Sequence, residues 1–280
     1  MNAIEIRNIV KEYPGFHLGP LDLVVPSGCI LGLVGENGAG KSTTIKLILD
    51  MIRSNSGTIT VLGQDNRVNL HLTKERIGVV LDDVGIPDSL DVAKVGKVMS
   101  RIYRNWDSER YESYIEKLAI PRGKRFKDLS RGNKMKLGIA IALSHGAELL
   151  ILDEATSGLD PVVRDEVVTL LHEFTRDPRH SILISSHIVS DLEKLCDYIA
   201  FLHKGKLLLY EEKDALMGEY GIIRGTAQQL AAIEPQAVIG SKLNAYGGEM
   251  MVRRNAVPVG MEISPITVEE LFLFMIKEVQ

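Results

Sequence analysis

The stretch Gly35-Glu36-Asn37-Gly38-Ala39-Gly40-Lys41-Ser42-Thr43 decides the fold of this chain. It follows the apolar run 30–34 and precedes the helix-like segment 44–49, and this order of strand, loop and helix is that of a phosphate-binding loop. In such a loop, glycines let backbone N–H groups converge on phosphate oxygens, lysine adds a charge at the β and γ phosphates, and a hydroxyl reaches Mg²⁺. A plain glycine-rich turn is the alternative, and the complete order of elements argues against it. The sequence therefore predicts a phosphate site formed by Gly35, Asn37, Gly38, Ala39, Gly40, Lys41, Ser42 and Thr43, with Ser42 as a Mg²⁺ ligand.

The composition is that of a globular protein with balanced charge. The 280 residues carry a net charge of −4 and are 45% hydrophobic, which predicts one large domain with a small appendage. Interspersed charges give no sign of a nucleic-acid binder or a polybasic membrane anchor. No apolar stretch approaches the roughly 18 residues that span a bilayer, and the N-terminus lacks a signal-peptide core. We therefore expect a cytoplasmic protein that acts on a membrane process only through another chain.

The two cysteines, Cys29 and Cys196, form neither a disulfide framework nor a metal-binding spacing. We interpret both as buried small hydrophobic residues in a reducing compartment, with a reactive thiol as the sharper alternative.

Two short runs of alternating apolar and polar residues, 3–10 and 18–25, flank Pro14 and Gly15. They predict an antiparallel strand pair with Tyr13 in the connection. From its position, Tyr13 has two interpretations: its ring stacks on an adenine base, or it covers the edge of the sheet.

Helical periodicity dominates from about residue 89 to residue 143. A first helix follows the N-cap candidate Asp91, and its apolar positions predict one buried face made of Val92, Val95, Val98, Met99 and Ile102. A further helix begins near Ser130 and ends at Leu143. Ser130 and Gly132 form a second possible anion site at its start, but from this segment alone an ordinary N-cap is the favoured interpretation of Ser130. This part of the chain predicts a helical subdomain inserted in an α/β core.

Acidic pairs follow two buried strands. Asp153 and Glu154 end the apolar run 148–152, at the strand ends where open α/β sheets bind ligands. With a phosphate loop upstream, Asp153 is expected to bind Mg²⁺ and Glu154 to orient or deprotonate the attacking water. Asp82 follows the strand 76–81 and is either a magnesium ligand or the polar start of a loop or helix.

Further along the chain, Asp160 and Pro161 predict the start of a helix that continues to Phe174. His187 follows the buried strand 181–185, where a histidine can touch a γ phosphate. Beyond about residue 214 the features of a nucleotide-binding domain end. Residues 267–279 have the pattern of an amphipathic helix that packs either on the core or on a partner.

Four stretches stand in a fixed order that resembles the ATP-binding cassette family. They correspond to the Walker A motif at 35–43, the signature motif Leu129-Ser130-Arg131-Gly132-Asn133, the Walker B strand ending at Asp153-Glu154, and the D-loop 157–160 followed by the switch histidine His187. The resemblance implies a P-loop NTPase of ABC type: an α/β RecA-like core, an N-terminal antiparallel β subdomain and an inserted helical subdomain at about 84–143. It places the nucleotide-binding domain at 1–213 and a small α/β extension at 214–280.

The resemblance also implies how the site works. ATP with Mg²⁺ lies between the phosphate loop of one cassette and Ser130 and Gly132 of a second, in a homodimer or a heterodimer. Asp160 joins this site through the D-loop, and Tyr13 becomes the adenine-stacking residue. Glu154 acts as the catalytic carboxylate, and His187 contacts the γ phosphate.

Two departures from the family pattern concern the signature and the Q-loop. Arg131 and Asn133 replace a glycine and a glutamine, while Ser130 and Gly132 are retained. Asp82 stands where the family has glutamine, and a carboxylate there reaches Mg²⁺ with a shorter, charged arm.

A single cassette without a transmembrane segment is similar to the ATPase subunits of ABC-2 exporters. The segment 103–107 is similar to cassettes of Gram-positive peptide, toxin and antibiotic-resistance exporters. The resemblance thus implies ATP hydrolysis for a separate polytopic permease chain, on the inner face of the cell membrane, with no nucleic acid as partner. The alternatives are a cassette protein of translation or DNA repair, and a degenerate regulatory subunit that binds ATP as a dimer. A lone phosphate loop without sustained heptads argues against the first, and the presence of Glu154 and His187 against the second.

Overall fold

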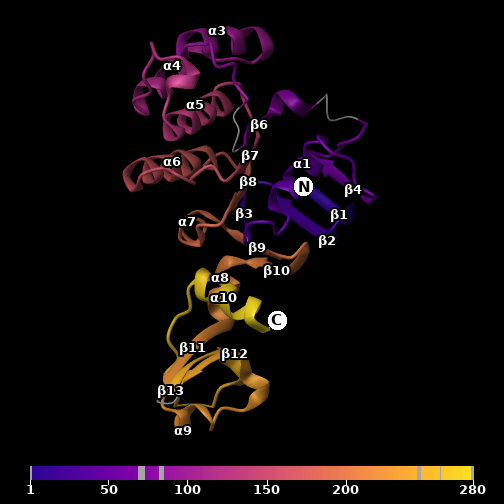
Figure 1. Cartoon of the computed structure of the whole chain (residues 1–280), viewed down its shortest axis with the longest axis vertical. Helices are drawn as coiled ribbons and strands as arrows, with labels where there is room; N and C mark the ends of the chain where they lie inside the picture. Colours follow the sequence, from indigo (N-terminus) through magenta and orange to yellow (C-terminus); the bar gives the residue numbers. More distant parts are fainter. Residues whose placement is uncertain (1, 69–72, 82–84, 245–246, 259, 279–280) are drawn as a thin grey trace.

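The computed structural model describes residues 2–68, 73–81, 85–244, 247–258 and 260–278. Its centre is a six-stranded sheet with the order β10-β9-β3-β8-β7-β6, in which β10 alone is antiparallel to its neighbour (Figure 1). These strands are β3 (Ile30–Val34), β6 (Ile77–Val80), β7 (Leu149–Asp153), β8 (Ser181–Ser186), β9 (Tyr198–His203) and β10 (Lys206–Glu212). Successive residues of β3 enter different hydrophobic clusters, Ile30 on one face and Leu31 on the other. The sheet is therefore covered on both faces, as its continuous apolar strands require.

One face of this sheet packs against an N-terminal antiparallel sheet and helix α1 (Lys41–Ile48). The antiparallel sheet has the order β2-β1-β4-β5, with β1 (Asn2–Tyr13), β2 (Phe16–Pro26), β4 (Ser56–Val61) and β5 (Gln64–Asp65). The predicted strand pair is present but longer than expected. Tyr13 is the last residue of β1 and pairs with Phe16, so it lies in the strand and not in the connection.

The other face carries helices, three of which form a subdomain inserted between the adjacent strands β6 and β7. These are α3 (Val92–Ile102), α4 (Ser108–Lys117) and α5 (Arg131–Leu143), and they are followed on the same face by α6 (Pro161–Phe174) and α7 (Val189–Leu195). Asp91 and Ser130 cap α3 and α5 as expected. Short 3-10 turns lie at Lys74–Arg76 and Phe126–Asp128.

One expectation for α3 is wrong. Val92 and Val95 are buried, but Val98 is 37% and Ile102 is 59% exposed. The buried stripe of α3 consists of Val92, Val95 and Gly96, so the second half of the helix turns two aliphatic side chains outward.

Gly96 lets α3 and α4 approach closely. The Tyr111 ring of α4 is buried against it, and the phenol donates a 2.8 Å hydrogen bond to the carbonyl oxygen of Val92. Burial raises the pKa of this phenol. A Cβ on Gly96 would lie 2.6 Å from the Tyr111 ring, so only glycine fits there.

The C-terminal residues form a second small layer. A three-stranded antiparallel sheet of order β11-β13-β12 is accompanied by α8, α9, α10 and two 3-10 turns, at Pro235–Ala237 and Arg254–Ala256. The bounds are α8 (Lys213–Glu219), β11 (Tyr220–Gly225), α9 (Ala227–Leu230), β12 (Val238–Asn244), β13 (Gly247–Arg253) and α10 (Val268–Glu278). The amphipathic helix α10 packs on β12 and on α7, with the Phe272 ring 5.1 Å from the Phe201 ring. The division at residue 213/214 stays a proposal, supported by the separate apolar cluster around Ile223, Leu230 and Val252.

Among the described residues, no helix is both long and apolar enough to cross a lipid bilayer. Cys196 is buried as expected, whereas Cys29 is half-buried. Burial raises the pKa of both thiols, which favours the unreactive protonated form over the reactive alternative.

We predict that Gly96→Ala destabilises the protein although alanine is the better helix former. The added Cβ would overpack the Tyr111 ring, at a cost of about 1–3 kcal/mol in the free energy of unfolding. Gly218→Ala in α8 is the control, because a Cβ there meets nothing within 4 Å and should stabilise by roughly 0.5–1 kcal/mol. Urea unfolding of both variants measures the difference, and equal shifts in the same direction would contradict the proposed packing.

Candidate functional site

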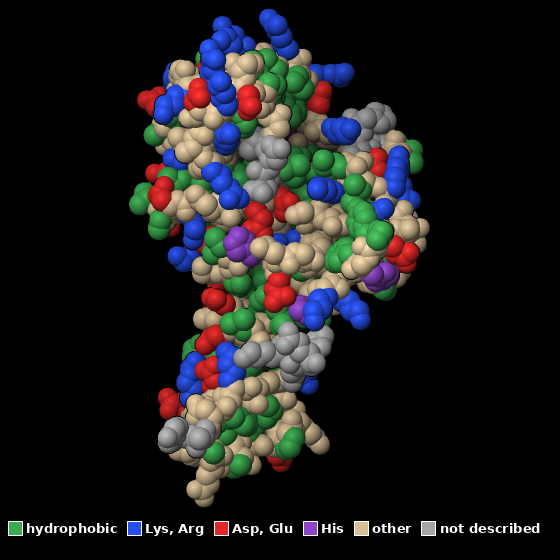
Figure 2. Space-filling view, in the orientation of Figure 1, with side chains coloured by type: hydrophobic (Ala, Val, Ile, Leu, Met, Phe, Trp, Pro, Cys, Tyr) green, Lys and Arg blue, Asp and Glu red, His purple; other side chains and the backbone are tan. Residues whose placement is uncertain are grey.

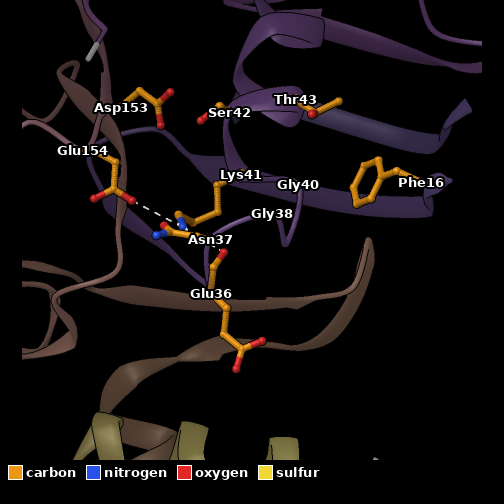
Figure 3. A pocket seen from close by; sticks show the side chains of 10 residues that line it. All are labelled: Phe16, Glu36, Asn37, Gly38, Gly40, Lys41, Ser42, Thr43, Asp153 and Glu154. Atoms are coloured by element: carbon orange, nitrogen blue, oxygen red, sulfur yellow. Dashed lines mark hydrogen bonds and ion pairs between the residues drawn. The ribbon is translucent and has the colours of Figure 1, made fainter. Parts of the chain in front are cut away.

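A cavity of about 540 Å³ opens at the carboxyl ends of β3 and β7 (Figure 3). Its volume suits a small-molecule ligand. Its walls come from β2, the phosphate loop, α1 and the end of β7, and consist of Phe16, Glu36, Asn37, Gly38, Gly40, Lys41, Ser42, Thr43, Asp153 and Glu154.

The phosphate loop leaves backbone donors available to an anion. Gly38 and Gly40 adopt φ values of +81° and +112°, which favour glycine. In the described part of the chain, α1 has no side-chain cap, and no acceptor is present for the N–H groups of Lys41, Ser42 and Thr43. A helix start with free donors and a positive dipole end fits a phosphate group. Gly35 and Ala39 are buried members of the loop.

Lys41 and Glu154 meet across the cavity. The Lys41 side chain is 6% exposed, and its Nζ lies 3.3 Å from Glu154 Oε1 (Figure 3). The same ammonium donates to the carbonyl oxygens of Gly35 at 2.7 Å and Glu36 at 3.3 Å. These three acceptors compensate the buried charge.

Glu154 is held by contacts from the neighbouring strand β8 as well. Its φ is +55°, a left-handed conformation that is uncommon outside glycine. Its N–H donates to the Ser185 carbonyl oxygen and to Ser185 Oγ, each at 3.1 Å. Its Oε2 accepts a 2.6 Å hydrogen bond from His187 Nδ1. An ionised carboxylate only accepts, so Nδ1 carries the proton in this pair.

Asp153 provides oxygen ligands suited to Mg²⁺. The carboxylate is buried, and its Oδ1 accepts a 2.5 Å hydrogen bond from Ser185 Oγ. Figure 3 shows Asp153 facing Ser42 at the start of α1. A hydroxyl and a carboxylate are hard oxygen donors that fit Mg²⁺. No group of three or more His, Cys, Asp or Glu residues gathers in the described ranges.

Several predicted site residues do not line this cavity. Ser130, Gly132 and Asp160 are absent from its walls, as are Tyr13 and His187. Ser130 Oγ and Asp160 Oδ1 accept the N–H groups of Asn133 at 3.3 Å and Val163 at 3.1 Å, so both are N-caps. Their roles in nucleotide binding stay predictions, as does that of Asp82, which lies outside the described residues.

The aromatic residue nearest the loop differs from the expected one. Phe16 lines the cavity, while Tyr13 is 42% exposed and has Lys11 Nζ 4.9 Å from its ring centroid. Tyr13 and Phe16 are directly paired, so their side chains lie on the same face of the sheet. Stacking of Tyr13 on adenine stays a prediction. Phe16, the strand partner of Tyr13, is the aromatic residue that lines the cavity.

Sequence reasoning missed Ser185 and His203. Ser185 contacts both acids, and its position at the end of a buried strand next to the acidic strand was the available signal. His203 is 2% exposed below the loop, with Nδ1 3.3 Å from Glu36 Oε2. No local pattern separates it from the other histidines.

Comparison with known proteins adds independent findings. A family model described as ABC transporter matches residues 18–157. The bacitracin transport ATP-binding protein BcrA of Enterococcus faecalis is 33% identical over 209 residues, covering 74% of this chain and 68% of the relative. The lantibiotic transport ATP-binding protein SrtF of Streptococcus pyogenes is 34% identical over 215 residues, covering 75% of this chain and 91% of the relative.

The fold is that of a solved ATP-binding subunit of an ABC transporter, with a TM-score of 0.68 at 24% identity over 76% of this chain and 91% of that one. The predicted fold class is therefore confirmed. The phosphate loop, the acids that face it and these matches together show that the chain belongs to the ABC transporter family, as a nucleotide-binding ATPase cassette.

Proposed function

We propose that this chain binds and hydrolyses ATP to power a separate membrane chain that exports peptides, toxins or other antimicrobial compounds. The observation that carries the proposal is the contact of Glu154 with both Lys41 and His187 beside the phosphate loop. The cargo class is supported by the names of the relatives, which describe bacitracin and lantibiotic transport.

The proposed chemistry begins when the ion pair between Lys41 and Glu154 is broken. An incoming γ phosphate competes with the carboxylate for Lys41, because both are anions within reach of one ammonium. Glu154 is then free to orient or deprotonate the attacking water. His187 would donate to the phosphate from its other ring nitrogen as the imidazolium, in which both ring nitrogens carry a proton. Ser42 and Asp153 would hold Mg²⁺, which would supply positive charge against the phosphate oxygens. Asp82 is proposed as a further ligand.

A second cassette completes the site in this proposal. Ser130 and Asp160 are exposed at helix starts and do not line the cavity of their own chain. We place them, with Gly132, against the nucleotide of the partner cassette, whether that partner is a second copy or a paralogue.

A groove offers a docking site for the membrane chain. Its volume is about 430 Å³, and it lies between the end of α1, β6 and the end of α3, lined by Leu49, Met51, Lys74, Glu75, Ile77, Val79, Leu81, Ile102 and Tyr103. Met51 is 55% and Val79 is 37% exposed. Exposed apolar side chains gathered in a groove mark a protein contact, and a permease segment there would hold the cassette on the inner face of the membrane.

We predict that Glu154→Gln abolishes turnover and retains ATP binding. The amide cannot accept a proton, and loss of a general base costs about 10²–10⁴-fold in rate. Steady-state hydrolysis assays, with gel filtration in ATP, should show an ATP-bound dimer that persists. Unchanged turnover would exclude Glu154 as the catalytic residue, and an unsubstituted chain inactive with and without its permease would favour the degenerate regulatory function.

Ser185→Ala should weaken Mg²⁺ binding about tenfold, because an outer-shell hydrogen bond that orients a metal ligand typically contributes this much. The measurement is the Mg²⁺ dependence of ATP hydrolysis. Ser186→Ala is the matched control, since the Ser186 hydroxyl contacts the backbone of Ile188. Identical Mg²⁺ curves for the two variants would contradict the role of Ser185.

Met51→Asp should release the chain from its permease, because it places a charge in the apolar groove. Val162→Asp is the control, as Val162 is 69% exposed on α6, outside the groove. Co-purification from native membranes measures the association. Recovery of a polytopic membrane chain with the control and not with Met51→Asp supports the exporter, whereas recovery of ribosomes or DNA ends would overturn it.

A further inference from the structure

We propose that the exposed face of α3 is a contact surface for an anionic phospholipid membrane. The proposal rests on the proposed function, which brings this helix close to the bilayer through the adjoining groove. The surface, called the α3 patch, consists of Lys94, Lys97, Val98, Arg101 and Ile102.

The charge of the helical subdomain differs from that of the whole chain. Residues 91–143 contain thirteen lysine and arginine residues against six aspartate and glutamate residues, although the chain has a net charge of −4. Figure 2 shows basic side chains gathered over the end of the molecule that α3 and α4 occupy. This end of the protein therefore favours an anionic partner.

The α3 patch lies on one side of its helix. Its members follow the spacing i, i+3, i+4, i+7 and i+8, which places side chains together on a helix surface. All five are exposed. The patch thus combines three cations with two aliphatic side chains.

The positive charge of the patch is largely uncompensated. Lys94 pairs with Asp91 at 2.7 Å. For Lys97 and Arg101, no acidic partner within ion-pair distance is found across the described ranges. The sequence has no aspartate or glutamate from Val92 to Trp106.

A lipid surface fits this combination better than another macromolecule does. Lys and Arg reach headgroup phosphates while aliphatic side chains enter the boundary with the acyl chains. The patch has no aromatic residue on which a nucleic-acid base could stack. At Ile102 it continues into the groove proposed to hold the permease. A permease bound in the groove would hold the patch next to the membrane. Even a weak lipid contact would then form, because the effective concentration of lipid at the patch is high.

The test is flotation of the purified full-length chain with vesicles of 70% phosphatidylcholine and 30% phosphatidylglycerol, against pure phosphatidylcholine, at low salt. Binding should require phosphatidylglycerol and weaken with salt. Each cation near an anionic surface contributes about fivefold to partitioning, so Lys97→Gln with Arg101→Gln should reduce binding roughly 25-fold. Val98→Ser should reduce it further.

The control pair is Arg176→Gln with Lys194→Gln, which removes the same charge from exposed positions outside α3. Basal ATP hydrolysis should be unchanged in both pairs. Equal binding by the patch variant and the parent, equal loss in the control, or equal binding to both vesicle types would overturn the proposal. The proposal would also be overturned if the patch variant no longer bound the detergent-solubilised permease. In that case the surface would be a protein contact.

These readouts separate the two proposals. Vesicle binding is measured without permease or ATP. The result of that measurement therefore stands even if the chain proves not to be an exporter subunit. Conversely, the chain could hydrolyse ATP and retain its permease without binding anionic vesicles. That result would disprove the lipid contact and leave the proposed function unaffected.

Discussion

The ion pair between Lys41 and Glu154 is the interaction on which the site depends. The two residues lie 113 positions apart in the chain, yet their Nζ and Oε1 atoms are 3.3 Å apart, with 6% and 15% of the side chains exposed. The parallel sheet brings them together, because β8 alone separates β3 from β7. Its register places Ser186 beside Val34 and Ser185 beside Asp153. Strand order thus creates the site, and the loop supplies the free donors.

The same sheet links the site to the groove. Arg76, just before β6, makes a two-pronged hydrogen bond with Glu148, just before β7, which lowers the pKa of that carboxyl. At the groove, the Tyr103 ring stacks 4.0 Å from the His145 ring, and His145 Nδ1 lies 3.1 Å from the carbonyl oxygen of Glu75. Contacts from the groove wall therefore reach Glu148, the residue that directly precedes β7.

Much of this arrangement could be predicted because its signals are local. The spacing of the phosphate loop and the N-caps Asp91, Ser130 and Asp160 depend on residues close together in the chain, and α6 begins and ends where the sequence indicates. Ser185 was missed because its contact with Asp153 spans 32 positions and exists only through strand pairing. The exposure of Val98 and Ile102 was missed because periodicity identifies an apolar face without showing what covers it.

The packing of α10 has a consequence for the energetics of the whole chain. Phe272 and Leu271 lie in the same apolar cluster as Leu192 of α7 and Phe201 of β9, and α7 begins two residues after His187. Unfolding the C-terminal layer would therefore expose the apolar side of the helix that follows this histidine. A nucleotide that binds the form with α10 docked more tightly than the form with α10 detached would oppose this detachment, even without touching the helix.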